Sequence, residues 1–124
     1  MLKLPYQLVN GIMLISVTAN GKEGLFAFDT GAMQTAVNKA HFPELQGKHM
    51  NIAKFSKGVK ESDAEEGILN ELRFSGIERS DMPVLIMDLM YVENALRSAM
   101  PDIKFLGTLG IDVIRNYTVL LDYN

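Results

Sequence analysis

The first third of the chain consists of short, mostly apolar stretches separated by turn dipeptides, the pattern of β-strands joined by tight turns. The first two of these stretches are residues 4–9 and 12–18, with Asn-Gly at 10–11 between them. Asn-Gly is a dipeptide preferred in two-residue hairpin turns. A second Asn-Gly at 20–21 precedes an apolar stretch at 25–28. This region therefore predicts three strands joined by two tight hairpins.

The rest of the chain predicts further short strands and short helices. Residues 91–100 place apolar side chains at helical spacing and stop before Pro101. Residues 54–67 are rich in Lys and Glu and are expected to form a polar loop or hairpin. The other expected elements are an extended stretch at 34–38, one or two helical turns in 39–45, strands at 68–74, 82–88, 105–110 and 117–122, and a short helix at 111–116. No repeat, linker or low-complexity segment is found, so the sequence predicts a single, mostly β domain over residues 1–124.

Composition limits the classes of function. The chain has 124 residues, of which 48% are hydrophobic and 22% charged, an ordinary globular balance. A formal net charge of −3, with no basic cluster interleaved with aromatic residues, argues against a nucleic-acid partner. No apolar run reaches the length of a membrane span, and the first residues do not resemble a signal peptide. We therefore expect a cytoplasmic protein without a membrane segment, unless the chain is one domain of a longer exported protein. The absence of cysteine excludes disulfides, zinc–thiolate sites and cysteine nucleophiles.

The segment FAFDTGA, residues 26–32, places a carboxylate, a hydroxyl and a glycine directly after an apolar strand. Gly31 allows a sharp turn and lets its amide approach the carboxylate of Asp29. Thr30 can lock the loop through a hydrogen bond. Asp29 is then expected to be held at a fixed angle in a partly desolvated place, where its pKa can be tuned. Taken alone, Asp-Thr-Gly also occurs in ordinary turns, so a turn aspartate is the alternative interpretation.

Two segments together resemble the pepsin-type aspartic proteases, and in particular their single-domain, retropepsin-like members. FAFDTGAMQTAVN is similar to the active-site segment of this family, and FLGTLGIDVIRNYTVLLDYN, about eighty residues later, is similar to its closing segment. Residues 108–110 fill an apolar-apolar-glycine motif with Thr108 as an imperfect first member, and 111–115 match the helix that follows. In the family the closing segment packs beneath the first, which requires Gly110 to be small. The resemblance implies a mainly β, single-domain retropepsin-like acid protease β-barrel with short helices.

The same resemblance implies an aspartic endopeptidase that acts on polypeptides and needs neither cofactor nor metal. The family uses two aspartates that share one proton, because like charges so close together cannot both ionise. This chain has a single Asp-Thr-Gly and no second Asp-Thr-Gly or Asp-Ser-Gly. The resemblance therefore implies a homodimer in which Asp29 of each chain faces the other across a two-fold axis. Thr30 is then expected to bond to the partner's backbone, and Gly31 to supply an amide near the carboxylates. The alternative function is a peptide-binding or interaction module that has kept the fold but lost catalysis.

Several other residues carry weaker signals. Asp112 is an alternative second aspartate from within the chain, but it matches a position that the family uses structurally, so a helix-terminus or loop-bonding role is expected. His41 and His49 do not have a spacing that fixes a metal geometry, and surface roles are expected for both. The eight methionines are expected mainly to fill the core, with Met33 or Met87 as candidates for lining an apolar cleft.

Two regions depart from the viral members of the family. Residues 55–67 correspond to the glycine-rich flap of those enzymes, yet here they are crowded with Lys and Glu. Residues 88–104 are longer than in the compact viral enzymes and are more similar to cellular and bacterial relatives. The fold is therefore predicted on firmer grounds than the activity.

Overall fold

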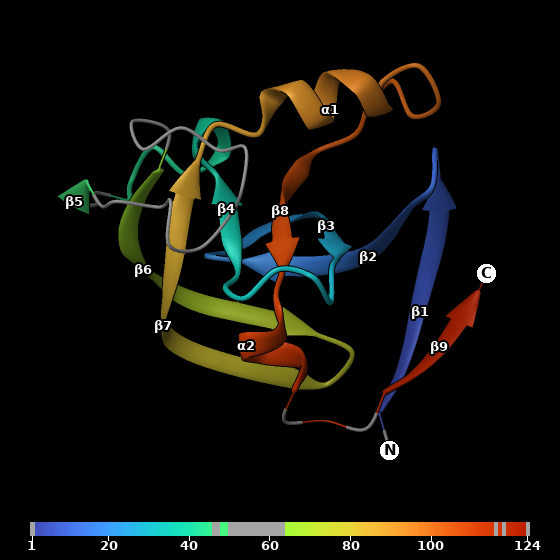
Figure 1. Ribbon diagram of the computed structural model, residues 1–124, viewed down its shortest axis with the longest axis horizontal. Coiled ribbons are helices and arrows are strands. Elements are labelled where there is room, and N and C mark those ends of the chain that lie inside the picture. Colours follow the sequence, from blue (N-terminus) through green and yellow to red (C-terminus); the bar gives the residue numbers. More distant parts are fainter. Residues whose placement is uncertain (1, 46–47, 50–63, 116, 118, 124) are drawn as a thin grey trace.

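The computed structural model describes residues 2–45, 48–49, 64–115, 117 and 119–123, and this part of the chain is mainly β (Figure 1). Its strands are β1 Leu2–Val9, β2 Ile12–Ala19, β3 Lys22–Phe28, β4 Ala36–Asn38, β5 Lys48–His49, β6 Ala64–Phe74, β7 Ile77–Met87, β8 Phe105–Leu109 and β9 Val119–Tyr123. Its helical elements are the 3-10 turn η1 Lys39–His41 and the α-helices α1 Met90–Leu96 and α2 Ile111–Ile114. Among the described residues, no helix is long and apolar enough to cross a bilayer.

Six of the strands close into a small barrel. The strand order of the sheet is β5-β6-β7-β4-β8-β3-β2-β1-β9, and a further antiparallel pairing joins β6 to β2. Apolar side chains fill the interior, among them the fully buried Phe26, Leu72 and Val84. Strands β1 and β9 pair in parallel beside the barrel, so the first and last strands of the described chain lie side by side (Figure 1). The predicted mainly β barrel with short helices is confirmed.

Tight turns with positive φ join the first strands as predicted. Residues 10–11 have φ of 50° and 79°, and residues 20–21 have φ of 49° and 77°. Both Asn-Gly dipeptides thus adopt the left-handed backbone that a two-residue hairpin requires.

A third turn of this kind, at residues 75–76, was not predicted. It joins β6 and β7, which pair in one register from Phe74 opposite Ile77 to Ala64 opposite Met87. The strands predicted at 68–74 and 82–88 were therefore too short, and residues 64–67, predicted as part of a polar loop or hairpin, form the start of β6. The ends of these strands are polar, so no apolar pattern predicts them. They are strands because their backbones pair with each other. Residues 54–63 of the predicted loop lie outside the described residues.

Helix α1 is shorter than predicted and is held by a buried carboxylate. Glu93 is only 1% exposed. Its Oε1 accepts a hydrogen bond from the backbone N–H of Phe105 at 2.9 Å and lies 2.6 Å from Nε2 of His41, and its Oε2 accepts one from Arg97 at 3.0 Å. The prediction of a surface role for His41 was wrong, because its ring is bonded to this buried group. The side chain of His49 lies outside the described residues.

The surroundings of Glu93 set its pKa. Burial alone raises the pKa, because it penalises the charged form. The hydrogen bonds from Phe105 and His41, together with the charges of His41 and Arg97, favour the carboxylate and hold the pKa of Glu93 below its ordinary value. The ionised Glu93 therefore joins α1 to η1 and β8, the elements on either side of it.

We predict that Glu93→Gln lowers the free energy of unfolding by about 2 kcal/mol at pH 7, because charge-assisted hydrogen bonds are lost. A lowered folded-state pKa stabilises the fold above the unfolded-state pKa, which is about 4.3 for Glu, and this contribution is lost as the pH falls through the folded-state pKa. Urea unfolding from pH 7 to pH 3 should thus show the two proteins converging at low pH. Glu78→Gln, at an exposed position on β7, is the matched control. Equal stabilities of both variants at pH 7 would contradict this role of Glu93.

Candidate active site

Asp29 follows the last residue of β3 and begins the loop to β4. Strands β3 and β8 run in parallel, and the backbone N–H of Asp29 continues their pairing by donating to the carbonyl of Leu109 at 3.1 Å. The loop then turns back, with the N–H of Gly31 donating to Oδ1 of Asp29 at 2.9 Å and the N–H of Ala32 donating to the Asp29 carbonyl at 3.2 Å. The carboxylate is therefore oriented by its own loop.

The three residues of the Asp-Thr-Gly segment are exposed. Asp29, Thr30 and Gly31 all lie on the surface of the described chain. The hydroxyl of Thr30 has no hydrogen-bond partner among the described residues. The expected partly desolvated environment of Asp29 is therefore not present in one chain, because no segment of the described residues covers this loop.

The end of the same loop is fixed by Asp112, on α2. The backbone N–H of Thr35 lies 3.1 Å from both carboxylate oxygens of Asp112, and the Thr35 hydroxyl donates to Oδ1 at 2.8 Å. The same hydroxyl accepts a hydrogen bond from the N–H of Gly110 at 3.1 Å. The predicted loop-bonding role of Asp112 is confirmed. Thr35 is fully buried, and its role was not predicted. The available signal was its position between the Asp-Thr-Gly turn and an apolar strand.

Two glycines let the closing segment approach the Asp29 loop. A Cβ at Gly110 would lie 2.7 Å from the backbone carbon of Gln34 and 2.9 Å from the carbonyl oxygen of Ala32. A Cβ at Gly107 would collide with the carbonyl oxygen of Ala36 and lie 2.9 Å from the ring of Phe26. The expected need for a small residue at Gly110 is confirmed, because any side chain there would displace the loop.

Asp29 opens onto a cavity of about 230 Å³. Gly31 and Thr108 lie beside it, and the walls are mostly apolar side chains from the loop, from β7 and from the start of α1: Met33, Leu85, Met87, Leu89 and Tyr91. Met33 and Tyr91 are 62% and 68% exposed, respectively. Both methionines suggested from the sequence thus line an apolar cleft. Asp29 is the only charged residue among the described residues that line this cavity.

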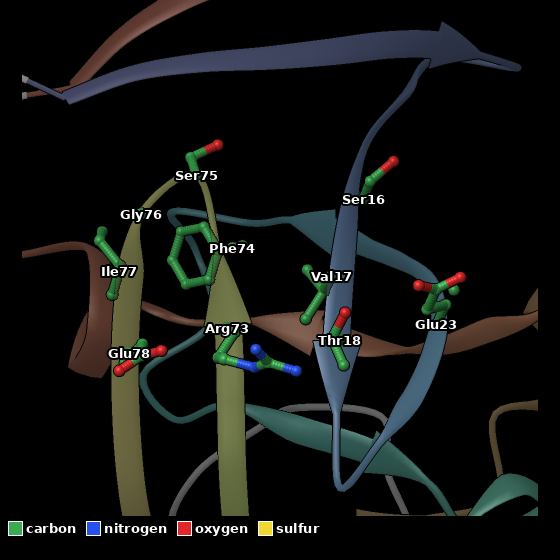
Figure 2. Close-up of a pocket in the computed structure, with 11 residues that line it drawn as sticks. Ser16, Val17, Thr18, Glu23, Arg73, Phe74, Ser75, Gly76, Ile77 and Glu78 are labelled. Carbon is green, nitrogen blue, oxygen red and sulfur yellow. The ribbon is translucent and has the colours of Figure 1, made fainter.

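A larger hollow of about 700 Å³ lies elsewhere on the barrel, between β2 and β3 on one side and the β6–β7 turn on the other (Figure 2). Arg73 extends across it, with Glu23 and Glu78 on opposite sides (Figure 2). No residue of the 26–32 segment lines this hollow. Among the described residues, no three acidic or histidine side chains are grouped so that they could hold a metal ion. The Asp29 cavity is therefore the candidate active site.

Comparison with known proteins agrees with this geometry. A family model described as aspartyl protease matches residues 15–113, which include both Asp29 and Asp112. The chain belongs to the aspartyl protease family. It is accordingly an aspartic-type peptidase by family. No curated protein matches the sequence.

Two solved structures share the fold. One is a retropepsin-like aspartic protease from Rickettsia conorii, with a TM-score of 0.59 and 16% identity over 91% of this chain and 77% of that one. Another is the EIAV protease complexed with the inhibitor HBY-793, with a TM-score of 0.54 and 16% identity over 86% of this chain and 91% of that one. Identities this low establish the fold alone, and that fold is the predicted retropepsin-like barrel.

We predict that Thr35→Val destabilises the protein by about 1–3 kcal/mol, because it leaves the buried N–H of Gly110 without its acceptor and removes the hydroxyl hydrogen bond to Asp112. Chemical unfolding at neutral pH measures the loss. Thr18→Val is the matched control, since the Thr18 hydroxyl has no bonding partner among the described residues. If the two variants unfold alike, the Thr35 hydroxyl does not support the loop.

Proposed function

We propose that the protein is an aspartic endopeptidase whose active site is completed by a second copy of the chain. The observation that carries the proposal is that the Asp29 cavity holds one carboxylate where the chemistry needs two. Asp112, the alternative second acid, is engaged by Thr35 instead. A two-fold axis that brings two Asp29 loops together supplies the missing group and covers the exposed Asp-Thr-Gly segment at the same time.

The two Asp29 carboxyl groups share one proton in this proposal, because two like charges at such a short distance cannot both ionise. The ionised member takes a proton from a water molecule as that water attacks the scissile carbonyl carbon. The protonated member donates its proton to the carbonyl oxygen, which gives a neutral tetrahedral intermediate. Collapse of this intermediate breaks the C–N bond: the Asp29 that took the proton from water donates it to the leaving nitrogen, and the other Asp29 takes a proton from a hydroxyl of the intermediate, which restores the starting pair. The N–H of Gly31, already directed at Asp29, stabilises the ionised form.

Other features of the chain support the assembly. Thr30 is exposed, and in this proposal its hydroxyl bonds to the partner's backbone. Strand β9 is at one end of the sheet, and the backbone of an edge strand can pair with another chain. The apolar walls of the Asp29 cavity suit side chains of an extended polypeptide substrate.

We predict that adding Asp29→Asn chains lowers the activity of the wild-type protein. A mixed dimer has one carboxyl group, and the amide of Asn cannot accept a proton from water at neutral pH, so the mixed dimer should be nearly inactive. If subunits exchange at random, a ninefold excess of variant should reduce the activity of a fixed amount of wild type to about a tenth. Cleavage of an unfolded protein substrate measures the activity. Asp102→Asn, at an exposed aspartate after α1, is the matched control and should leave the activity unchanged.

The mixing result separates the two ways of building the site. Mass spectrometry first confirms that the subunits exchange. If the activity then stays proportional to the amount of wild-type chain, a site shared between chains is contradicted. Asp112 would then be the first candidate for the second acid. Activity that persists in pure Asp29→Asn protein would show that Asp29 is not catalytic.

We also predict a bell-shaped pH profile with its maximum on the acidic side of neutral. Both the fully protonated and the fully ionised pair of carboxyl groups are inactive, so activity falls on both sides of the maximum. Initial rates with one peptide from pH 3 to pH 9 test this. A rate that rises steadily through alkaline pH would exclude a shared-proton mechanism.

A further inference from the structure

A second cavity adjoins the Asp29 cavity. It has a volume of about 370 Å³. Met33 and Gln34 line both cavities, so one continuous surface leads from Asp29 to the second cavity. Met82 and Pro83 of β7 add apolar surface to it. A peptide that lies extended over Asp29 advances about 3.3 Å per residue, so its side chains beyond the scissile bond can reach this place.

Two arginines distinguish the second cavity from the first. Arg79 of β7 is half-buried and Arg115, directly after α2, is exposed, and both line it. Neither guanidinium is hydrogen-bonded or ion-paired to another described residue. Asp112 also lines the cavity, but its carboxylate accepts hydrogen bonds from the amide and hydroxyl of Thr35. The charged groups that line the cavity thus carry a net positive charge, beside a cleft whose own charged residue is Asp29.

We infer that this cavity is a substrate subsite for an acidic side chain, with Arg79 and Arg115 as its specificity-determining residues. A guanidinium matches a carboxylate through paired N–H donors, and two guanidinium groups at one cavity favour Glu or Asp over any neutral side chain. The preferred substrate then carries apolar side chains at the scissile bond and an acidic side chain farther along. This inference rests on the proposed function, because the occupant is the same polypeptide that Asp29 cleaves.

The first experiment is a positional-scanning peptide library cleaved by the wild-type protein. It should show an acidic preference at one or more positions that do not flank the scissile bond. Peptides matched to the best-cleaved sequence, with Glu, Gln or Lys at that position, then give the size of the effect. We expect kcat/KM for the Glu peptide to exceed that for the Gln peptide about three- to tenfold, the range for partly exposed charged pairs. The ratio should shrink as salt is added.

Variants assign the preference to residues. The double variant Arg79→Ala/Arg115→Ala should cleave the Glu and Gln peptides at the same rate, and the Glu peptide should lose more kcat/KM than the Gln peptide. Arg79→Lys/Arg115→Lys should recover part of the preference. Arg73→Ala is the matched control, since Arg73 lies on the same β-hairpin but lines the separate hollow of Figure 2. It should retain the full preference.

The outcomes distinguish this inference from the proposed function. Cleavage without any acidic preference, or a preference that survives in the double alanine variant, overturns the inference and leaves the proposed peptidase activity unaffected.

If the wild type cleaves no peptide, the proposed function fails. The subsite is then tested by fluorescence anisotropy with the acidic and the matched amide pools of the library. Tighter binding of the acidic pool that depends on the two arginines supports the subsite, and equal binding of both pools overturns it.

Discussion

The hydrogen bonds between Thr35 and Asp112 hold the proposed catalytic loop in place, and the geometry of the candidate site depends on them. Strands β3 and β8 are parallel neighbours, so the loop after β3 and the helix after β8 leave the sheet at the same edge. Asp112 accepts hydrogen bonds from both the amide and the hydroxyl of Thr35, and Gly110 donates to that hydroxyl. Because these groups are buried or half-buried, breaking one bond leaves its partner unsatisfied at a cost of about 1–3 kcal/mol. An exposed Asp29 is therefore carried on a loop whose far end is rigid.

The proposed division of the active site between two chains follows from what this loop lacks. Its backbone orients the carboxylate through Gly31, but no other described segment covers it or brings a second acid to its cavity. A single carboxylate exposed to water has no neighbouring acid with which it could share a proton. A second loop related by a two-fold axis changes both conditions, because it excludes water and adds a like charge. Dimerisation and proton sharing would then be one physical event.

Much of the fold could be predicted from the sequence where local chemistry decides the structure. The two Asn-Gly turns need positive φ, and Gly110 must be small wherever a loop packs against its backbone, so both were predictable. The full length of the β6–β7 hairpin was not, because its polar ends are strands only through pairing with each other. The bond between His41 and Glu93 was not predicted, and a loop-bonding role was predicted for Asp112 without its partner Thr35. Each of these bonds joins residues more than fifty positions apart, and no local pattern marks the partners.

The stoichiometry of a transition-state mimic tests the central claim most directly. A peptide analogue with a hydroxyl-bearing carbon at the scissile position occupies the place of the attacking water and should bind between two Asp29 groups. Isothermal titration calorimetry at mildly acidic pH should give one inhibitor bound per two chains, and Asp29→Asn should abolish that binding. A stoichiometry of one inhibitor per chain, with each chain binding independently, would contradict a site built from Asp29 of both subunits.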